Sequence, residues 1–359
     1  MNALFLKITA ASLALAIAAP AAIAQQSLKM TTPWAGGPWL ERDAQGFADR
    51  VAELTDERVT IDVFPGGTLY SPLKVTEAVR EGVADVGHNY MAYDWGIDKA
   101  TVPFSGFSGS LTPEAYMLWL YEAGGLELWQ DYREEVFGVI AFPCSILATE
   151  IFLHSKKPVR TLEDFAGLKL RTSGAWAEIA SRLGASTVIM PGGEVYDALE
   201  RGVIDATEWG SPEINRPTGL QDIAQYVVVP GIHQPGGFLE CQFNTEVWSK
   251  ISSDDQEAIR AAAKLTVFES WLQSSRQDLS AFAELEAGEN EIIELDQSFI
   301  DAVAEETEAW SNEVAAENEW FARVQGSIDE FKSELQVWGK YRLPVQGEAA
   351  VVPGEAAAN

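Results

Sequence analysis

Residues 75–85 read VTEAVREGVAD and residues 195–205 read VYDALERGVID, so the chain repeats the frame V-x-x-A-x-x-x-G-V-x-D. A Pro-Gly-Gly tripeptide precedes both copies, at 65–67 and at 191–193. The apolar positions share one face of a helix, and the glycine favours the left-handed backbone that ends a helix before a strand begins. We therefore expect two lobes of related design, each directing the residues after its aspartate toward a shared cleft.

Strands and helices alternate around the first copy of this frame, which is typical of a sheet covered by helices. Period-two and helical patterns predict strands at 28–32, 59–64 and 83–88 and helices at 39–54 and 73–81.

The sequence becomes long, acidic and helical after the motif Ser252-Ser253-Asp254-Asp255, which is a typical helix start. Helical patterns cover 254–285 and 298–338. Helices of this length could bridge the lobes or pair with a second subunit.

The length of the chain favours two lobes over one core. We expect an α/β, two-lobed fold with the first lobe at 27–150, completed by part of 240–300. The second lobe is expected at 151–240, completed by part of 300–343, with the long helices of 253–343 bridging lobes or dimerising.

The ends of the chain predict export. Lys7 precedes an apolar run at 8–19, and Ala22-Ile23-Ala24 offers small residues for signal peptidase. We expect residues 1–24 to be a signal peptide that is cleaved before Gln25, which places the mature, soluble protein in the periplasm; a membrane anchor is the alternative. Residues 345–359 are expected to be a disordered tail.

The charge of the chain argues against two classes of partner. With 25 Lys and Arg against 54 Asp and Glu, the formal charge is −29, which disfavours binding to nucleic acid or to anionic membranes. The only cysteines are Cys144 and Cys241. We expect two buried free thiols, with a disulfide as the alternative that an oxidising compartment permits.

Four charged residues interrupt or end apolar segments, where an unpaired charge is costly: Glu150, Arg171, Glu208 and Glu240. If all four converge, their net charge is −2, and the carboxylate of a ligand lowers it further. A bound divalent cation would offset this charge, and calcium suits oxygen ligands in irregular geometry, with sodium as a second choice. Arg171 would then hold the ligand carboxylate with its two-pronged guanidinium. Each glutamate could instead lie on an edge strand in water.

Motifs for catalysis are missing from the sequence. The three histidines do not have the spacing of a zinc site, and the chain has no nucleophile elbow and no P-loop. Aromatic residues gather near predicted strand ends instead, where they could shape a ligand site. Those that we assign to the site are Trp34, Tyr90, Tyr93 and Trp209, and Trp39, Trp95 and Trp176 lie in similar positions.

Three segments resemble one known family: EAVREGVADVG at 77–87, GLKLR at 167–171 and LERGVIDATEW at 199–209. The chain resembles, from about residue 28 to residue 343, the DctP-type solute-binding subunit of tripartite ATP-independent periplasmic (TRAP) transporters, and especially the branch that binds 2-oxo acids and lactate.

The resemblance implies a long helix across both lobes and specific roles for site residues. Arg171 matches the arginine that holds the ligand carboxylate, and Glu208 and the backbone of Trp209 match metal ligands. Glu150 stands where the branch often carries glutamine, so this chain departs from the pattern there. Glu240 lies in a segment that also reaches the site in the family, although its alignment is loose.

We therefore expect a receptor and not an enzyme. It would bind a 2-oxo acid such as pyruvate, or a 2-hydroxy acid such as lactate, through Arg171 and a metal held by Glu150, Glu208 and Glu240, and deliver it to a membrane permease. Some members of the branch dimerise through their C-terminal helices, and the long acidic helices of this chain would permit a homodimer as well. The alternatives are a metal-free TRAP receptor for a sugar acid or compatible solute, and a periplasmic metal-dependent hydrolase or lyase.

Overall fold

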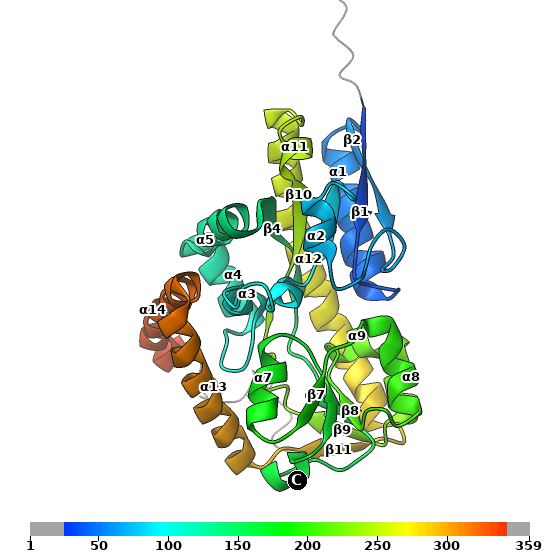
Figure 1. Cartoon of the computed structure of the whole chain (residues 1–359), viewed down its shortest axis with the longest axis vertical. Coiled ribbons are helices and arrows are strands. Elements are labelled where there is room, and N and C mark those ends of the chain that lie inside the picture. Colours follow the sequence, from blue (N-terminus) through cyan, green and yellow to red (C-terminus); the bar gives the residue numbers. More distant parts are fainter. Residues whose placement is uncertain (1–24, 343–359) are drawn as a thin grey trace, which may run out of the picture.

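The computed structural model describes residues 25–342 as two α/β lobes with a long helix across both (Figure 1). The first lobe is built on a five-stranded sheet and the second on a six-stranded sheet. This arrangement confirms the predicted fold class. The predicted signal peptide and C-terminal tail lie outside the described residues.

The sheet of the first lobe is mixed. Strand β1 pairs in parallel with β2 and β3, while β10 pairs antiparallel with β3 and β4. The strands in spatial order are β2 (Val59–Phe64), β1 (Gln26–Thr31), β3 (Val86–Asn89), β10 (Gly237–Asn244) and β4 (Val139–Leu147). The helices of this lobe are η1 (Trp39–Ala44), α1 (Gln45–Leu54), α2 (Val75–Arg80), η2 (Met91–Asp94), α3 (Thr101–Ser105), α4 (Pro113–Glu122), α5 (Gly125–Tyr132), η3 (Arg133–Phe137) and α11 (Thr245–Trp248).

The sheet of the second lobe repeats this design around β6 and β8, which pair in parallel. Its strands in spatial order are β11 (Glu291–Glu294), β9 (Tyr226–Val229), β5 (Leu153–Ser155), β8 (Ala206–Thr207), β6 (Lys169–Arg171) and β7 (Ser186–Val188). Its helices are α6 (Leu162–Phe165), α7 (Gly174–Arg182), η4 (Gly192–Glu194), α8 (Val195–Glu200), α9 (Pro212–Asn215), η5 (Arg216–Thr218) and α10 (Leu220–Ile223).

The repeated sequence frame has the same structure in both lobes. Gly82 and Gly202 end α2 and α8 with φ of +73° and +71°, the region that favours glycine. The following aspartates bond to the neighbouring strand: Asp85 accepts the backbone N–H of Lys29 at 2.8 Å, and Asp205 accepts that of Lys169 at 3.1 Å. Each aspartate thus fixes the register of the strand that leads to the cleft.

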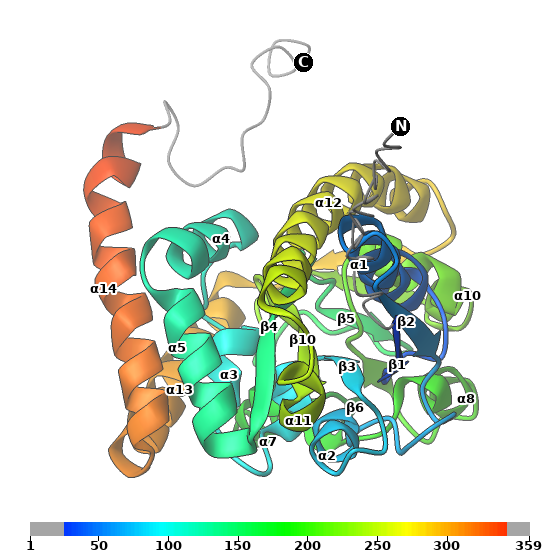
Figure 2. The ribbon, with the colours of Figure 1, turned by 90° about the horizontal axis from the view of Figure 1, so that it is seen from above.

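Helix α12 (Ser253–Glu286) connects the lobes, since it packs on β4 and α1 of the first lobe and on α9 of the second. Seen from above, it spans the molecule beside the sheet strands (Figure 2). It begins as predicted, because the side chain of Ser252 accepts the backbone N–H of Asp255.

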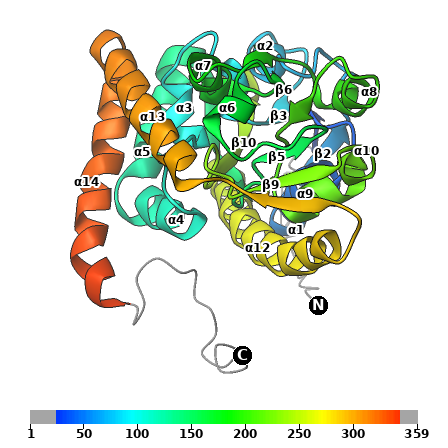
Figure 3. The same cartoon turned by 90° about the horizontal axis from the view of Figure 1, so that it is seen from below.

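Two further helices return from the second lobe to the first (Figure 3). Helix α13 (Gln297–Glu317) packs on α7, and α14 (Glu319–Arg342) packs on α3 and α5. The helical pattern at 298–338 forms two helices and not one, because the chain bends at Asn318. The side chain of Asn318 accepts the backbone N–H of Phe321 and so caps a new helix.

The expected lobe boundaries also need correction. Strand β10 begins at Gly237 and pairs in the first sheet, so the boundary expected near residue 240 falls inside a strand. Only part of the segment 240–300 was expected to complete the first lobe: β10 pairs in the first sheet, whereas β11 lies in the second. Within the segment 300–343, α13 packs on α7 of the second lobe and α14 packs on α3 and α5 of the first, so the two helices connect the lobes.

Cys144 and Cys241 form a disulfide between β4 and β10, so the expectation of two free thiols is wrong. The two residues are 97 positions apart in the sequence, and their proximity depends on antiparallel pairing that no local pattern reveals. Both are fully buried in the core of the first lobe. Within residues 25–342, no helix is long and apolar enough to cross a membrane.

Candidate functional site

A small cavity lies between the lobes, at the strand ends to which the repeated frame leads. The first lobe contributes Tyr90 after β3 and Glu150 after β4. The second lobe contributes Arg171 at the end of β6 and Glu208 after β8. Ligand sites in open α/β sheets usually lie at such strand ends.

Arg171 is buried and held by partners of its own lobe. Its Nη1 atom donates to Oε1 of Glu208 at 3.2 Å, and Nη2 donates to the carbonyl of Met190 at 3.1 Å. The guanidinium also lies over the Trp209 ring, 5.2 Å from its centroid. Its Nε–H has no partner among the described residues. The guanidinium of Arg171 is therefore fixed in the cavity with one hydrogen-bond donor unused, and this arrangement suits an anionic ligand.

Glu150, Glu208 and His233 form a compact, buried cluster beside Arg171. One possible ligand atom from each lies within 4.8 Å of those of the other two. Burial raises the pKa of Glu150 well above its usual value and raises that of Glu208, with Arg171 opposing both shifts. Burial also lowers the pKa of His233 to about 4, so the imidazole is neutral at physiological pH.

His233 reaches this cluster through a tight backbone contact. Its Nε2 atom lies 3.0 Å from Oε2 of Glu150. A Cβ atom on Gly231 would lie 1.9 Å from the carbonyl oxygen of Glu150, so only glycine lets the connection after β9 pass there. The other ring nitrogen, Nδ1, is buried without a partner in the described part of the chain.

The cluster fits a cation by chemistry and by charge. Two ionised carboxylates and one guanidinium sum to −1, and a bound carboxylate would make −2. A divalent cation would bring this sum to zero, whereas sodium would leave −1. Carboxylate oxygens suit calcium, while the imidazole either ligates the ion or orients Glu150 through the observed hydrogen bond. Burial raises the pKa of both carboxyl groups, so a positive charge between them would stabilise their ionised forms.

Aromatic rings form the remaining walls of the cavity. Nε1 of Trp34 donates to Nδ1 of the buried His88 at 2.8 Å, which fixes the indole plane. Tyr90 and Tyr93 meet edge to face at 5.3 Å between centroids. Burial raises the pKa of Tyr93 to about 12, so its hydroxyl stays protonated and can donate to a ligand oxygen.

Glu240 does not belong to this site, so its assignment as a metal ligand is wrong. It lies inside the first lobe, where Oε1 accepts from Nη2 of Arg133 at 2.7 Å and Oε2 accepts from Nε1 of Trp129 at 3.3 Å. Asp94 accepts from the same Arg133 nitrogen at 3.1 Å. The negative charge of Glu240 is therefore balanced within its own lobe.

The structure brings together the other residues that the sequence selected and adds two that it missed. Glu150, Arg171, Glu208 and the four chosen aromatic residues line the cavity, as do Trp39 and Trp176. Trp95 instead packs against the core. The missed residues are His233 and Gln234, whose carbonyl accepts the backbone N–H of Glu150 at 3.2 Å. The neighbouring Gly231 and the Pro-Gly-Gly sequence at 235–237 are the features of the sequence that could have indicated a site loop here.

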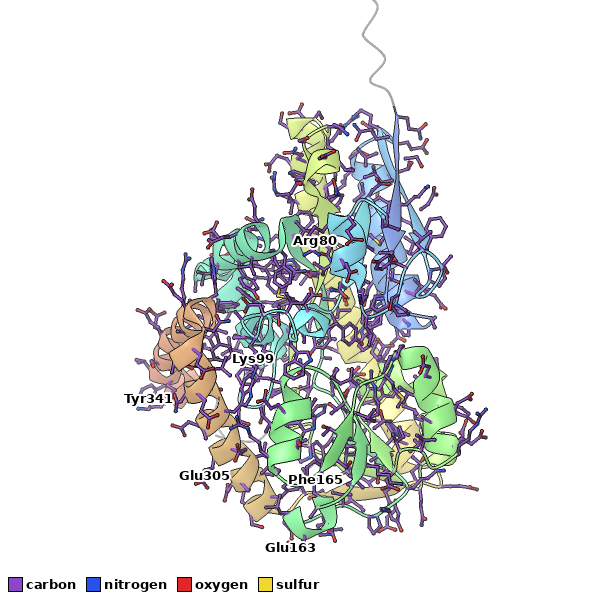
Figure 4. All side chains as sticks on the ribbon, viewed as in Figure 1. Arg80, Lys99, Glu163, Phe165, Glu305 and Tyr341 are labelled. Carbon is purple, nitrogen blue, oxygen red and sulfur yellow. A yellow bond between two sulfur atoms is a disulfide. The ribbon has the colours of Figure 1, made fainter. Side chains whose placement is uncertain are left out.

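Direct contacts across the cleft show that the lobes are closed in this structure. The rings of Trp39 and Trp209, from opposite lobes, lie 5.7 Å apart. Nζ of Lys99 pairs with Glu178 of α7 at 2.8 Å, and Figure 4 shows Lys99 at the level where the lobes meet. Such closure excludes water from the cavity and strengthens its electrostatic interactions.

The sequence and the structure match one family of proteins. The model of the family "Bacterial extracellular solute-binding protein, family 7" matches residues 34–318. The monocarboxylate 2-oxoacid-binding periplasmic protein of a Nostoc species is 32% identical over 277 residues, which cover 76% of this chain and 75% of that protein.

Two solved structures are similar over nearly the whole described chain. A TRAP periplasmic solute-binding protein from Pseudoalteromonas atlantica, with bound sodium and pyruvate, has a TM-score of 0.84 at 26% identity, covering 88% of this chain and 97% of that one. Another from Colwellia psychrerythraea, with bound calcium and pyruvate, has a TM-score of 0.81 at 26% identity and covers the same shares.

Proposed function

Because the chain belongs to family 7 of the bacterial extracellular solute-binding proteins, the receptors of TRAP transporters, we propose that it captures a small 2-oxo or 2-hydroxy monocarboxylate such as pyruvate or lactate. The observation that carries this proposal is the buried Arg171 beside the cluster of Glu150, Glu208 and His233. A cation and an arginine in one small cavity suit a ligand with two adjacent oxygen groups.

In this proposal Arg171 binds the carboxylate of the ligand. The guanidinium keeps its bonds to Glu208 and Met190, which fix its orientation before the ligand arrives. Preorganisation of this kind lowers the entropic cost of binding. Tyr93 and the neighbouring aromatic rings close the cavity around the short carbon skeleton and keep it dry.

Glu150 and Glu208 would hold the cation, and His233 would orient Glu150. The cation would supply the positive charge that two carboxylates and an anionic ligand need together, and would attract the 2-oxo or 2-hydroxy oxygen. The charge sum favours calcium over sodium. The backbone carbonyl of Trp209 remains a proposed further ligand, as the family resemblance implies.

Relatives support the class of ligand. The Nostoc relative is named for monocarboxylate 2-oxoacids, and the two similar structures contain pyruvate together with sodium or calcium. We propose that closure of the two lobes around the acid produces the form that a TRAP permease recognises. An exported, periplasmic location follows from this role and from the signal peptide expected at 1–24.

Titration calorimetry with pyruvate and lactate, before and after removal of metal by a chelator, tests the proposal. We expect binding of one acid per chain that weakens strongly in the chelated protein and in Glu208→Ala. Glu200→Ala, which removes an exposed carboxylate of the same lobe, is the matched control and should bind normally. Metal-independent binding of a sugar acid or a compatible solute would support the first alternative instead, and turnover of the acid would support the hydrolase or lyase.

We also propose a homodimer formed through the C-terminal helix. The last turns of α14 expose Val337, Trp338 and Tyr341, with 70%, 63% and 76% of their surfaces accessible. Figure 4 shows Tyr341 at the outer edge of the molecule. Exposed apolar residues on one helix end are typical of an interface with another chain. Light scattering should give twice the chain mass, and Trp338→Glu should give the mass of one chain.

A further inference from the structure

An ion pair joins the two lobes close to the ring contact of Trp39 and Trp209. Arg42 follows Trp39 by three residues in η1, and Glu213 follows Trp209 by four residues in α9. Nη1 of Arg42 donates to Oε1 of Glu213. The two side chains are only 15% and 1% exposed, so the contact is shielded from solvent. We call Arg42 and Glu213 the interlobe pair.

Burial separates the interlobe pair from a second ion pair across the cleft. Lys99 and Glu178 are 38% and 29% exposed. An exposed ion pair contributes little, because water and salt screen it. Removal of one member of a buried pair has a larger effect, because the remaining charge stays buried without its partner. Of these two contacts, the interlobe pair is therefore the one on which the closed form depends more.

Helix α12, which spans both lobes, fixes the position of Glu213. Oγ of Ser274 donates to Oε1 of Glu213 at 2.9 Å. The backbone N–H of Glu213 donates to Oδ1 of Asp278 at 2.8 Å. Ser274 and Asp278 are four residues apart, so they lie on one face of α12. Glu213 is thus held by α12 independently of Arg42.

Arg42 is held in the same way within the first lobe. Its Nε and Nη2 atoms donate to the two carboxylate oxygens of Asp43 at 2.7 Å and 3.1 Å. Ser145 of β4 donates to Oδ2 of Asp43 at 2.7 Å and lies 3.0 Å from Oγ of Ser270 in α12. Each member of the interlobe pair therefore has partners that it can keep when the lobes separate.

We propose that the interlobe pair determines how long the closed lobes retain the bound acid. This inference rests on the proposed function and goes beyond it, because neither Arg42 nor Glu213 lines the cavity. They are positioning residues, and they act on the acid through Trp39 and Trp209, which do line it. When the lobes open, the pair separates while each member keeps its other partners, so the contact forms and breaks reversibly.

Glu213→Gln and Arg42→Gln, each of which removes one charge of the pair, test the proposal. Stopped-flow tryptophan fluorescence at constant calcium measures the association and the release of pyruvate. We expect each variant to release pyruvate about tenfold to a hundredfold faster, with a much smaller change in association. The double variant should release it about as fast as the single variants, because both changes remove the same contact.

Arg58→Gln is the matched control. Arg58 pairs with the buried Asp255 of α12 at 2.8 Å, and this contact ties the first lobe to α12 without joining the two lobes. The control should release pyruvate at the unaltered rate. Small-angle X-ray scattering at saturating pyruvate should give Glu213→Gln the radius of gyration of the unaltered protein, which establishes that the variant folds and closes.

Three results would overturn the inference and leave the proposed function intact. They are an unchanged release rate in Glu213→Gln, effects of the two substitutions that multiply in the double variant, and an equally fast release in Arg58→Gln. A failure of the proposed function gives a different result, because the unaltered protein then binds neither pyruvate nor lactate. In that case the role of the interlobe pair in retaining the acid fails with it.

Discussion

The imidazole of His233 and the carboxylate of Glu150 lie 3.0 Å apart in the closed cleft, and both are buried. Because the ring is neutral, its Nε2–H tautomer can donate a hydrogen bond to this carboxylate oxygen. This bond fixes the carboxylate where it can face Glu208. The pair therefore joins the connection after β9 to the end of β4 at the centre of the site.

We predict that His233→Ala weakens pyruvate binding by about tenfold to a hundredfold, because Glu150 loses the donor that orients it. His233→Gln should recover part of this loss, since an amide can donate to the same oxygen. His154→Gln is the control, because His154 is equally buried but lies outside the cavity. Calorimetry at constant calcium provides the measurement, and equal affinities of the alanine and glutamine variants would contradict the role of the hydrogen bond.

Arg171→Lys should weaken pyruvate binding by at least about tenfold while the thermal midpoint changes little. Lysine keeps the charge but lacks the planar fork that bonds Glu208, Met190 and a ligand carboxylate at once. The control is Arg201→Lys, at an exposed position of the same lobe. A lysine variant with unchanged affinity would show that charge alone suffices and that the fork has no role.

Glu240→Ala should destabilise the protein and leave its metal-dependent binding unchanged. The substitution leaves the fully buried Arg133 with only Asp94 as an ionic partner, and removing one member of a buried pair costs about 3–5 kcal/mol. Thermal unfolding and calorimetry measure the two effects separately. Loss of calcium dependence in a variant that remains folded would instead show that Glu240 is a ligand of the metal.

The sequence predicted the place of Glu208 in the site but assigned Glu240 to the same site wrongly, and the two cases differ in the information that they need. The repeated frame predicted the strand that leads to Glu208, and the structure gives it the same geometry around Asp85 and Asp205. A charge within an apolar strand indicates a buried partner but not which one. For Glu240 the partner is Arg133, 107 positions away, and only the tertiary fold brings them together.

His233 was missed for a related reason. His233 lies in the loop after β9 and not in a strand. Its position depends on the close contact between the backbones of Gly231 and Glu150. The break at Asn318 was equally hidden, because the helical pattern continues through it. Local patterns report periodicity, whereas a loop residue and a helix cap depend on what packs against them.

Reduction of the disulfide between Cys144 and Cys241 should lower the thermal midpoint by about 5–10 °C, because the bond constrains a long loop of the unfolded chain. The double variant Cys144→Ala, Cys241→Ala should have the lower midpoint already and should not respond to a reductant. Pyruvate affinity should remain the same, since both residues lie in the core of the first lobe. A thiol assay on the denatured, unreduced protein that finds two free thiols would refute the bond.

His154 should make the free energy of unfolding depend on pH. Burial lowers its pKa from 6.5 to about 4, so the unfolded chain binds a proton more readily than the folded one. Its contribution to stability is complete above the unfolded pKa of about 6.5 and is lost as the pH falls toward about 4. The expected slope is at most about 1.4 kcal/mol per pH unit.

His154→Gln tests this prediction, because glutamine can still accept the amide N–H of Asn215 that now bonds Nε2. The variant should lose stability less steeply than the unaltered protein in urea unfolding between about pH 4 and pH 7. Glu150 and Glu240, whose pKa values are raised, contribute slopes of the opposite sign in both proteins, so these cancel in the comparison. If the free energy of unfolding changed with pH equally in the two proteins, His154 would have the same pKa in the folded and the unfolded chain. Its burial would then not disfavour the protonated ring.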